Sequence, residues 1–208
     1  MLLGGIQGEQ KGLISYFIAE DAMNDASKQS DIQTHTELLR AALKSQYHAT
    51  LAMLRDTIES CPEELWLSEE HLNSFWQIAY HALFFAHAYM QPSKAAFSPW
   101  EHQQSNVQHP DCIPGPPDPN STLPLIPKPY TKEQVLAYWN FCEEMVDKWC
   151  DALDLHSPDS GFPNYKMPKL EHQIVNIRHI EHHMAQLADR LRSSAHKGVK
   201  WVRGVTPR

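Results

Sequence analysis

The sequence predicts an all-α protein, a four-helix bundle with a long proline-rich crossover between helices 2 and 3. Four long segments carry apolar residues at the three-and-four spacing of amphipathic helices. No segment shows the alternation that is typical of a β-strand. Ten of the fifteen prolines fall between residues 91 and 130, and they exclude a regular helix there because each one removes an amide donor and restricts the preceding residue.

Composition narrows the class of protein. With 208 residues, 42% of them hydrophobic, the chain is long enough for one principal domain with a sizeable core. The formal charge of -7 argues against a nucleic-acid partner or an anionic membrane surface, because both need clustered Lys and Arg. No apolar run approaches the roughly 18 residues of a membrane span. The four cysteines form no C-x-x-C pair, and no secretory signal precedes them, so a cytoplasmic location is expected.

The pattern divides the chain into three parts. Residues 1–33 mix glycines and polar residues around one apolar patch, which predicts a poorly anchored extension or a short helix. Residues 34–193 contain the four periodic segments and form the predicted bundle domain. Residues 194–208 are expected to form an irregular C-terminal tail.

The first two helices are expected before the crossover. Thr34-His35-Thr36-Glu37 matches a capping box and predicts a helix over 35–60, ended by Cys61-Pro62. Its apolar face comprises Leu39, Leu43, Tyr47, Leu51, Leu54 and Ile58. A second helix is expected from Ser68, a good N-cap, to about Met90. It is apolar nearly all round and is therefore expected to be buried.

The third and fourth helices follow the crossover at 91–130. Thr131-Lys132-Glu133-Gln134 is a second capping box, which predicts a helix to about Leu153. Pro168 is suited to the first position of a fourth helix that ends near Ser193. The apolar residues of this last helix are Leu170, Ile174, Ile177, Ile180, Met184, Leu187 and Leu191.

Histidines in the fourth helix are the candidate functional residues. His179 and His183 are four residues apart, so they point within about 40° of each other and can offer two imidazoles to one metal ion. His182 lies roughly 100° from His183 and is a poor partner. The pair belongs to a polar stripe beside the apolar stripe of the helix. Such a stripe could line a cleft, or it could simply be the solvated face of the helix.

A third ligand must come from another helix, and the second helix offers His81, which shares the face of Ile78 and Phe84. Alone, His81 would be interpreted as a core residue bonded to a carbonyl. Opposite a His pair, it completes a three-imidazole set with an open position, as in catalytic metal sites. His87 faces another side, and His48 of the first helix is a boundary residue that could enter the site. Solvent exposure is expected for His35, His71, His102, His109, His156 and His196.

These residues resemble the DinB/YfiT-like superfamily, metal-dependent hydrolases and thiol-dependent S-transferases built on a four-helix bundle. The resemblance covers about residues 34–193 and rests on Trp76-x-x-x-x-His81 and His179-x-x-x-His183-x-x-Gln186-Leu187, with the long crossover between them. It implies that His81, His179 and His183 hold a divalent metal, zinc or nickel, whose other positions carry water. The family's activities imply a small-molecule substrate or a low-molecular-weight thiol.

Three functions remain open at this point. The first is a metal-dependent hydrolase or thiol S-transferase. Hydrolysis needs a general base, and Glu181, about 200° from His179, points away, which favours thiol activation. The second is a non-catalytic, stress-associated bundle in which the metal braces two helices and aromatic surfaces form a homodimer. The third is a solvated histidine stripe that binds no metal. No catalytic residue other than a metal ligand can be assigned.

Overall fold

A computed structural model describes residues 6–109, 113–114, 125–126 and 128–205. The chain divides into two compact units, Met1–Ala41 and Ala42–Arg208. Five α-helices provide almost all regular structure in the described residues, so the all-α prediction is confirmed. None of the described helices combines the length and apolarity needed to cross a bilayer.

The first unit is the leading part of helix α1, which runs without interruption from Ile6 to Ser60. The predicted start near residue 35 is wrong. Thr34 and Thr36 donate their hydroxyl hydrogens to the carbonyls of Ser30 and Ile32, four residues earlier, so they lie inside the helix and do not cap it. The helix continues upstream because no proline precedes Pro62.

The second unit begins with the last part of α1, which ends before Cys61-Pro62 as predicted. The predicted second helix is two helices, a single turn α2 at Glu63–Trp66 and the long α3 at Phe75–Tyr89. Ser68 does not cap a helix, because its hydroxyl accepts from the Glu70 amide in a local turn. The cap is Ser74, whose own amide donates to the Gln77 side chain at 2.9 Å.

The two helices after the crossover start where the sequence predicts. Helix α4 spans Lys132–Ala152, and its capping box is present, since the Gln134 amide donates to the Thr131 hydroxyl and the Thr131 amide donates to the Gln134 side chain. Helix α5 spans Lys169–Ala195, directly after Pro168. It ends at His196, which has the left-handed backbone (φ 54°) typical of a helix C-terminus.

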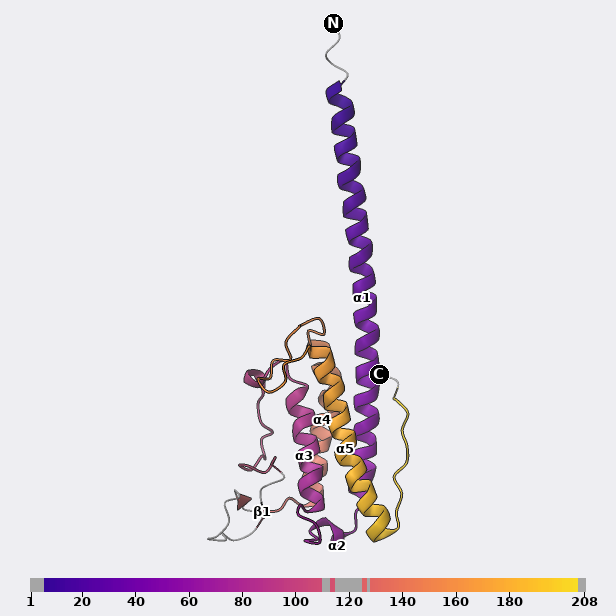
Figure 1. Ribbon diagram of the computed structural model, residues 1–208. Helices are drawn as coiled ribbons and strands as arrows, with labels where there is room; N and C mark the ends of the chain where they lie inside the picture. Colours follow the sequence, from indigo (N-terminus) through magenta and orange to yellow (C-terminus); the bar gives the residue numbers. More distant parts are fainter. Residues whose placement is uncertain (1–5, 110–112, 115–124, 127, 206–208) are drawn as a thin grey trace. The chain divides into compact units, whose positions relative to one another are not determined.

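Helix α3 packs against both α4 and α5 (Figure 1). The last part of α1 is joined to the same two helices by buried hydrogen bonds. Tyr47 of α1 donates to the Gln173 side chain of α5 at 2.8 Å. Trp139 of α4 donates its indole N–H to the carbonyl of Leu51 at 2.7 Å. These bonds satisfy polar groups inside an apolar contact and fix the helices in register.

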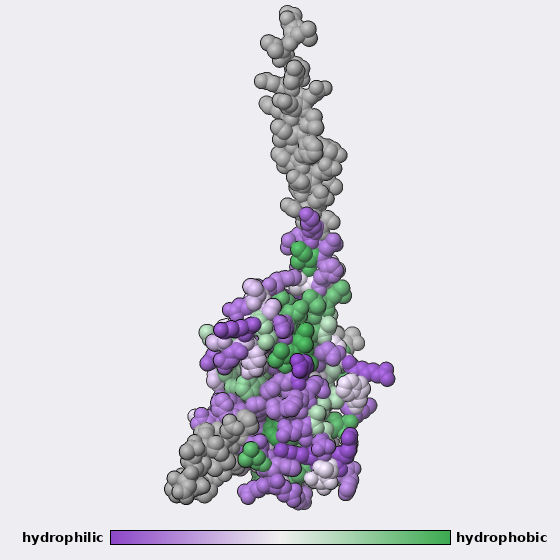
Figure 2. Space-filling model, viewed as in Figure 1, coloured by the Kyte–Doolittle hydropathy of each residue, from purple (hydrophilic) through white to green (hydrophobic). Residues whose placement is uncertain are grey.

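An aromatic core lies between these helices, and its largest fully buried side chains include Trp66, Trp76, Tyr47, Tyr80, Tyr138 and Phe75. Two apolar residues predicted to face the core do not. Leu39 is 38% exposed and Ile174 is 51% exposed. Hydrophilic side chains cover most of the remaining surface in the view of Figure 2, as expected for the outer faces of amphipathic helices.

The crossover is irregular, as its prolines require, but it contains short ordered elements. A 3-10 turn η1 spans Lys94–Ala96. Strands β1 (Ile113–Pro114) and β2 (Leu125–Ile126) pair in parallel, a two-residue contact that sequence patterning did not predict. Alternation cannot be recognised in so short a segment. After α5 the tail is extended, and its Lys197 side chain donates to the carbonyl of Ser60 at 2.8 Å.

Candidate metal centre

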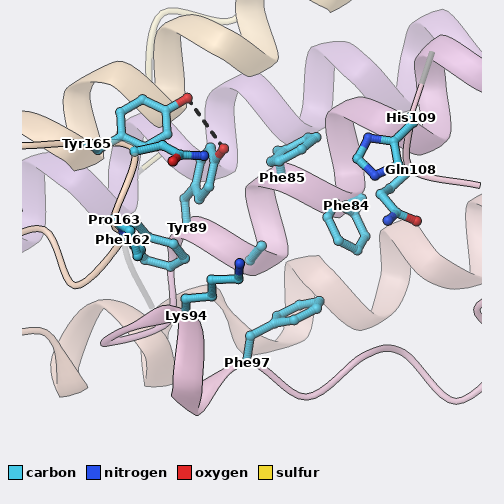
Figure 3. A pocket seen from close by; sticks show the side chains of 12 residues that line it. Phe84, Phe85, Tyr89, Lys94, Phe97, Gln108, His109, Phe162, Pro163 and Tyr165 are labelled. Carbon is cyan, nitrogen blue, oxygen red and sulfur yellow. Dashed lines mark hydrogen bonds between the residues drawn. The ribbon is translucent and has the colours of Figure 1, made fainter. Parts of the chain in front are cut away.

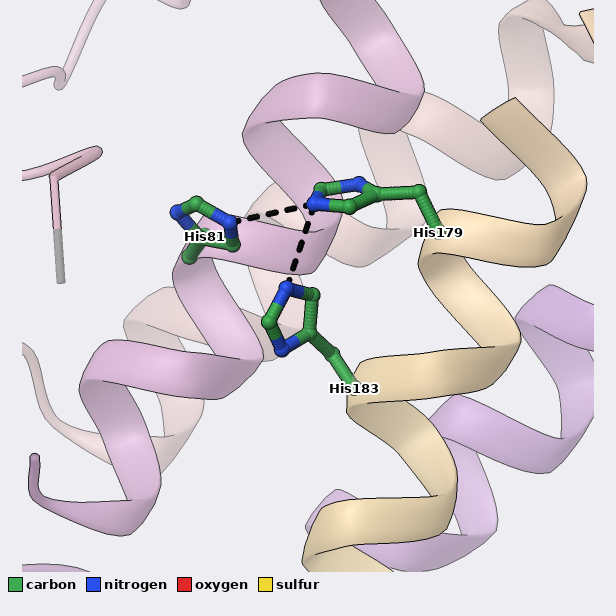
Figure 4. A group of neighbouring side chains, drawn as sticks. All are labelled: His81, His179 and His183. Carbon is green, nitrogen blue, oxygen red and sulfur yellow. Dashed lines mark hydrogen bonds between the residues drawn. The ribbon is translucent and has the colours of Figure 1, made fainter. Parts of the chain in front are cut away.

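The three predicted histidines meet in one place. His81 lies near the middle of α3, and His179 and His183 lie one turn apart on α5. Figure 4 shows the three rings pointing toward one another across the gap between the two helices. His81 is 8% exposed, and the other two are half-buried. The position of the pair on α5 therefore follows from helix periodicity, and the opposing ring follows from the packing of α3 on α5.

The spacing of the ring nitrogens fits a divalent ion. Nε2 of His179 lies 3.2 Å from Nε2 of His81 and 3.1 Å from Nε2 of His183. All three ligand atoms lie within 4.8 Å of one another. Two nitrogens bound tetrahedrally to zinc at about 2.0–2.1 Å are about 3.3 Å apart. The group could thus hold a metal ion.

The outer nitrogens of two rings are oriented by hydrogen bonds. His81 donates from Nδ1 to the carbonyl oxygen of Gln108 at 2.6 Å, and His183 Nδ1 lies 3.2 Å from Oε1 of Gln186. Because both acceptors are oxygens, both protons lie on Nδ1, and the Nε2 lone pairs face the centre of the group. Nδ1 of His179 is buried without a partner among the described residues.

The electrostatics of the group favour neutral rings. The pKa of His179 is lowered to about 3, mainly by burial and also by the neighbouring His81 and His183 rings, because a second positive charge would repel the first. Burial also lowers the pKa of His183. Since a metal binds only unprotonated imidazole, the site is ready for an ion at neutral pH without first losing protons.

Two other residues of α5 lie away from the site, as predicted. Glu181 accepts a hydrogen bond from the Thr50 hydroxyl of α1. His182 is exposed and contacts only the edge of the His183 ring among the described aromatic rings, with centroids 4.9 Å apart. Neither residue supplies a general base to the three histidines.

His48 does not enter the site. Its ring bridges two acidic residues of α4, with Nδ1 2.7 Å from Glu143 and Nε2 3.2 Å from Asp147. The bond to Glu143 is the main cause of a raised pKa. The six histidines predicted to be exposed are all exposed.

Two further histidines are buried apart from the group. His87 of α3 stacks on Trp149 and lies 3.0 Å from the Tyr138 hydroxyl. His172 of α5 is fully buried among the rings of Tyr89, Phe162 and Tyr165. Burial lowers the pKa of both His87 and His172 to about 4, so both are neutral at pH 7.

A cavity of about 390 Å³ lies beside Phe84, Phe85 and Tyr89 of α3 and was not predicted (Figure 3). It is lined by Phe84, Phe85, Ala88, Tyr89, Lys94, Phe97, Gln108, His109, Phe162, Pro163, Asn164 and Tyr165. We call it the aromatic pocket. The Phe85 ring also contacts the rings of His81 and His179, with centroids 4.8 and 5.3 Å away. The aromatic residues of the pocket come from α3, from the crossover (Phe97) and from the segment between α4 and α5, so no single sequence pattern predicts it.

The chain matches no family model, no curated protein and no solved structure. The geometry of the site is therefore the basis for a proposed function.

Proposed function

We propose that this protein is a metal-dependent enzyme of the DinB/YfiT-like kind. In this proposal the family's four-helix bundle is formed by the last part of α1 together with α3, α4 and α5, and the crossover connects α3 to α4. The single observation that carries the proposal is the convergence of three imidazoles from two helices, with Nε2 atoms 3.1 and 3.2 Å apart. Two of them are held by oxygen acceptors, which is the outer-shell arrangement of metal-binding histidines.

Zinc or nickel is the proposed ion, because imidazole suits both metals. Three neutral ligands leave the ion its full charge, so when bound it supplies a Lewis acid that stabilises the anion of a coordinated water or thiol. His81, His179 and His183 would hold it. Gln108 and Gln186 would orient two of the three rings.

Within this proposal, thiol activation is favoured over hydrolysis. Hydrolysis needs a positioned base, and Glu181 of α5 lies away from the three histidines and accepts a hydrogen bond from Thr50. A thiol needs only to lose its proton and to be held near an electrophilic acceptor. The proposed substrates are therefore a low-molecular-weight thiol and a small electrophile.

A non-catalytic metal site is the second candidate. It is favoured by the position of the three histidines, which link α3 to α5 and would brace the two helices if a metal bound them. The two candidates differ in the fourth coordination position of the metal ion. A catalytic site keeps this position free for substrate, whereas a structural site fills it with a protein ligand.

Metal analysis of the purified protein tests the metal. Elemental analysis should find about one zinc or nickel per chain in the wild type and in His182→Ala, and much less in His179→Ala. Equal metal content in His179→Ala and His182→Ala would contradict the site. A screen of thiols with electrophilic acceptors then tests catalysis, and activity that persists in His81→Ala would rule out the metal as its source.

A further inference from the structure

Part of the lining of the aromatic pocket is apolar and buried. Phe84, Ala88 and Phe162 belong to this lining, and each is less than 10% exposed. Neighbouring rings meet edge to face, with centroids 5.0 Å apart for Phe84 and Phe85 and 5.2 Å apart for Tyr89 and Phe162. A planar apolar group can therefore bury its surface there and meet ring edges on several sides.

Other lining residues of the pocket are exposed. They are Lys94, His109, Pro163 and Asn164. Figure 3 shows the Lys94 side chain reaching in among the aromatic rings. The Lys94 amide donates to the carbonyl of Gly161 at 3.0 Å, which holds the base of this side chain against the segment that carries Phe162.

The charge of the pocket is one-sided. Its lining contains one lysine and no Asp or Glu. Within the described part of the chain, no acidic side chain pairs with Lys94. An anionic ligand beside Lys94 would form an ion pair without displacing an acidic side chain, whereas a cationic ligand would be repelled by the lysine.

The pocket and the group of three histidines have two neighbouring residues in common, Phe85 and Gln108. The Phe85 ring lies against both His81 and His179. Gln108 lines the pocket with its side chain, and its carbonyl accepts the hydrogen bond from His81. A molecule bound in the pocket would thus contact a residue, Phe85, that also contacts two of the three histidines.

We propose that the aromatic pocket binds the electrophilic substrate, and that this substrate is a small aryl or similarly flat apolar molecule with a carboxylate that pairs with Lys94. A separate carbon of the same molecule is the electrophile: the thiolate sulfur forms a bond to it while its leaving group departs with the bonding electron pair, and the thiol proton passes to solvent. The inference rests on the proposed function, because it assigns the acceptor for the reaction at the three histidines. Lys94 is a binding residue in this account and takes no part in the chemistry.

The test is calorimetric titration of the full chain with phenylacetate, 3-phenylpropionate and 4-phenylbutyrate, and with their neutral carboxamides. At least one acid should bind more tightly than its amide. Lys94→Met should weaken the acid about fivefold, as expected for an exposed ion pair, and leave the amide unchanged. The matched control is Lys148→Met, which removes an exposed charge from α4 and should change neither affinity.

A second variant tests whether the buried apolar lining of the aromatic pocket contacts the ligand. Ala88→Phe places a ring where the substrate ring would lie, and it should weaken both acid and amide at least about tenfold while thermal unfolding and metal content stay near the wild type. If Ala88→Phe does not fold, the Lys94→Met comparison alone decides. Equal binding of acid and amide to the wild type, or no binding of any probe, would overturn the inference.

Metal content separates this inference from the proposed function. Binding that depends on Lys94 in a protein without metal would support the pocket and contradict the metal enzyme. Binding that vanishes on chelation and is insensitive to Lys94→Met would mean that the carboxylate binds the metal, which overturns the pocket assignment and supports the metal site.

Discussion

His81 and Gln108 are 27 residues apart in the chain, yet Nδ1 of His81 lies 2.6 Å from the Gln108 carbonyl oxygen. A carbonyl oxygen can only accept, so the proton of His81 is held on Nδ1 and its Nε2 lone pair faces His179 and His183. The crossover therefore orients a side chain of the candidate metal centre. A segment that looks like a mere connection in the sequence takes part in building the site.

Gln186 is expected to do the same for His183. Its Oε1 lies 3.2 Å from His183 Nδ1. Gln186→Leu removes this acceptor and should weaken zinc or nickel binding about tenfold, measured by competition with a chelator. Gln46→Leu makes the same change at an exposed position of α1 and should leave the affinity unaltered. If both variants bind metal like the wild type, Gln186 does not orient the ring.

His172 should be replaceable by an apolar residue. It is fully buried, and neither ring nitrogen has a partner among the described residues. His172→Leu removes this desolvation cost, so its free energy of unfolding at pH 7 should equal or exceed that of the wild type. Urea denaturation measures this free energy, and a decrease of more than about 1 kcal/mol at pH 7 would show that the His172 ring has a stabilising hydrogen-bond partner.

The same variant should reduce acid sensitivity. The folded pKa of His172 is about 4, lowered by burial and then by Lys169, and lies below the unfolded value near 6.5. As the pH falls, the unfolded chain therefore binds a proton at His172 before the folded protein does. Stability is full above about pH 6.5 and falls as the pH drops toward 4. At pH 5, His172→Leu should gain about 2 kcal/mol on the wild type beyond any difference at pH 7.

His87 should behave in the opposite way at neutral pH, because its ring has a polar partner. His87→Leu leaves the buried Tyr138 hydroxyl without the ring nitrogen at 3.0 Å, and it should lower the free energy of unfolding by about 1–3 kcal/mol. Adding Tyr138→Phe should restore part of that loss, since the unpaired hydroxyl is then gone. Strictly additive losses in the double variant would argue against this bond.

Gly161 has no room for a side chain. Its φ is +80°, and a Cβ there would lie 2.3 Å from the carbonyl oxygen of Pro92. Gly161→Ala should cost about 1–3 kcal/mol in backbone strain, with a further loss from the clash. Gly198, whose Cβ would meet nothing within 4 Å, provides the control. Gly198→Ala should unfold at nearly the wild-type denaturant concentration.

Sequence patterns predicted a helix start correctly where the first turn of the helix contains its own start signal. The Thr131 capping box and Pro168 place the starts of α4 and α5 correctly, because both act on the first turn of a helix. The same reasoning failed at Thr34, which forms hydrogen bonds inside a longer helix, and at Ser68, where a turn uses the hydroxyl. A capping motif shows that a residue can cap a helix, and its neighbours decide whether it does.

Periodicity similarly determined which residues of α5 share a face, so the His179–His183 pair could be recognised from spacing alone. Sequence could not decide where His172 and Ile174 lie, because one became buried and the other exposed according to which helices cover them. Nor could it place Lys94, Gln108 and Phe162 around one pocket, since contacts between distant segments depend on packing. Helix geometry is local and readable along the chain, whereas the approach of α3 to α5 and of the crossover to His81 is a property of the folded protein.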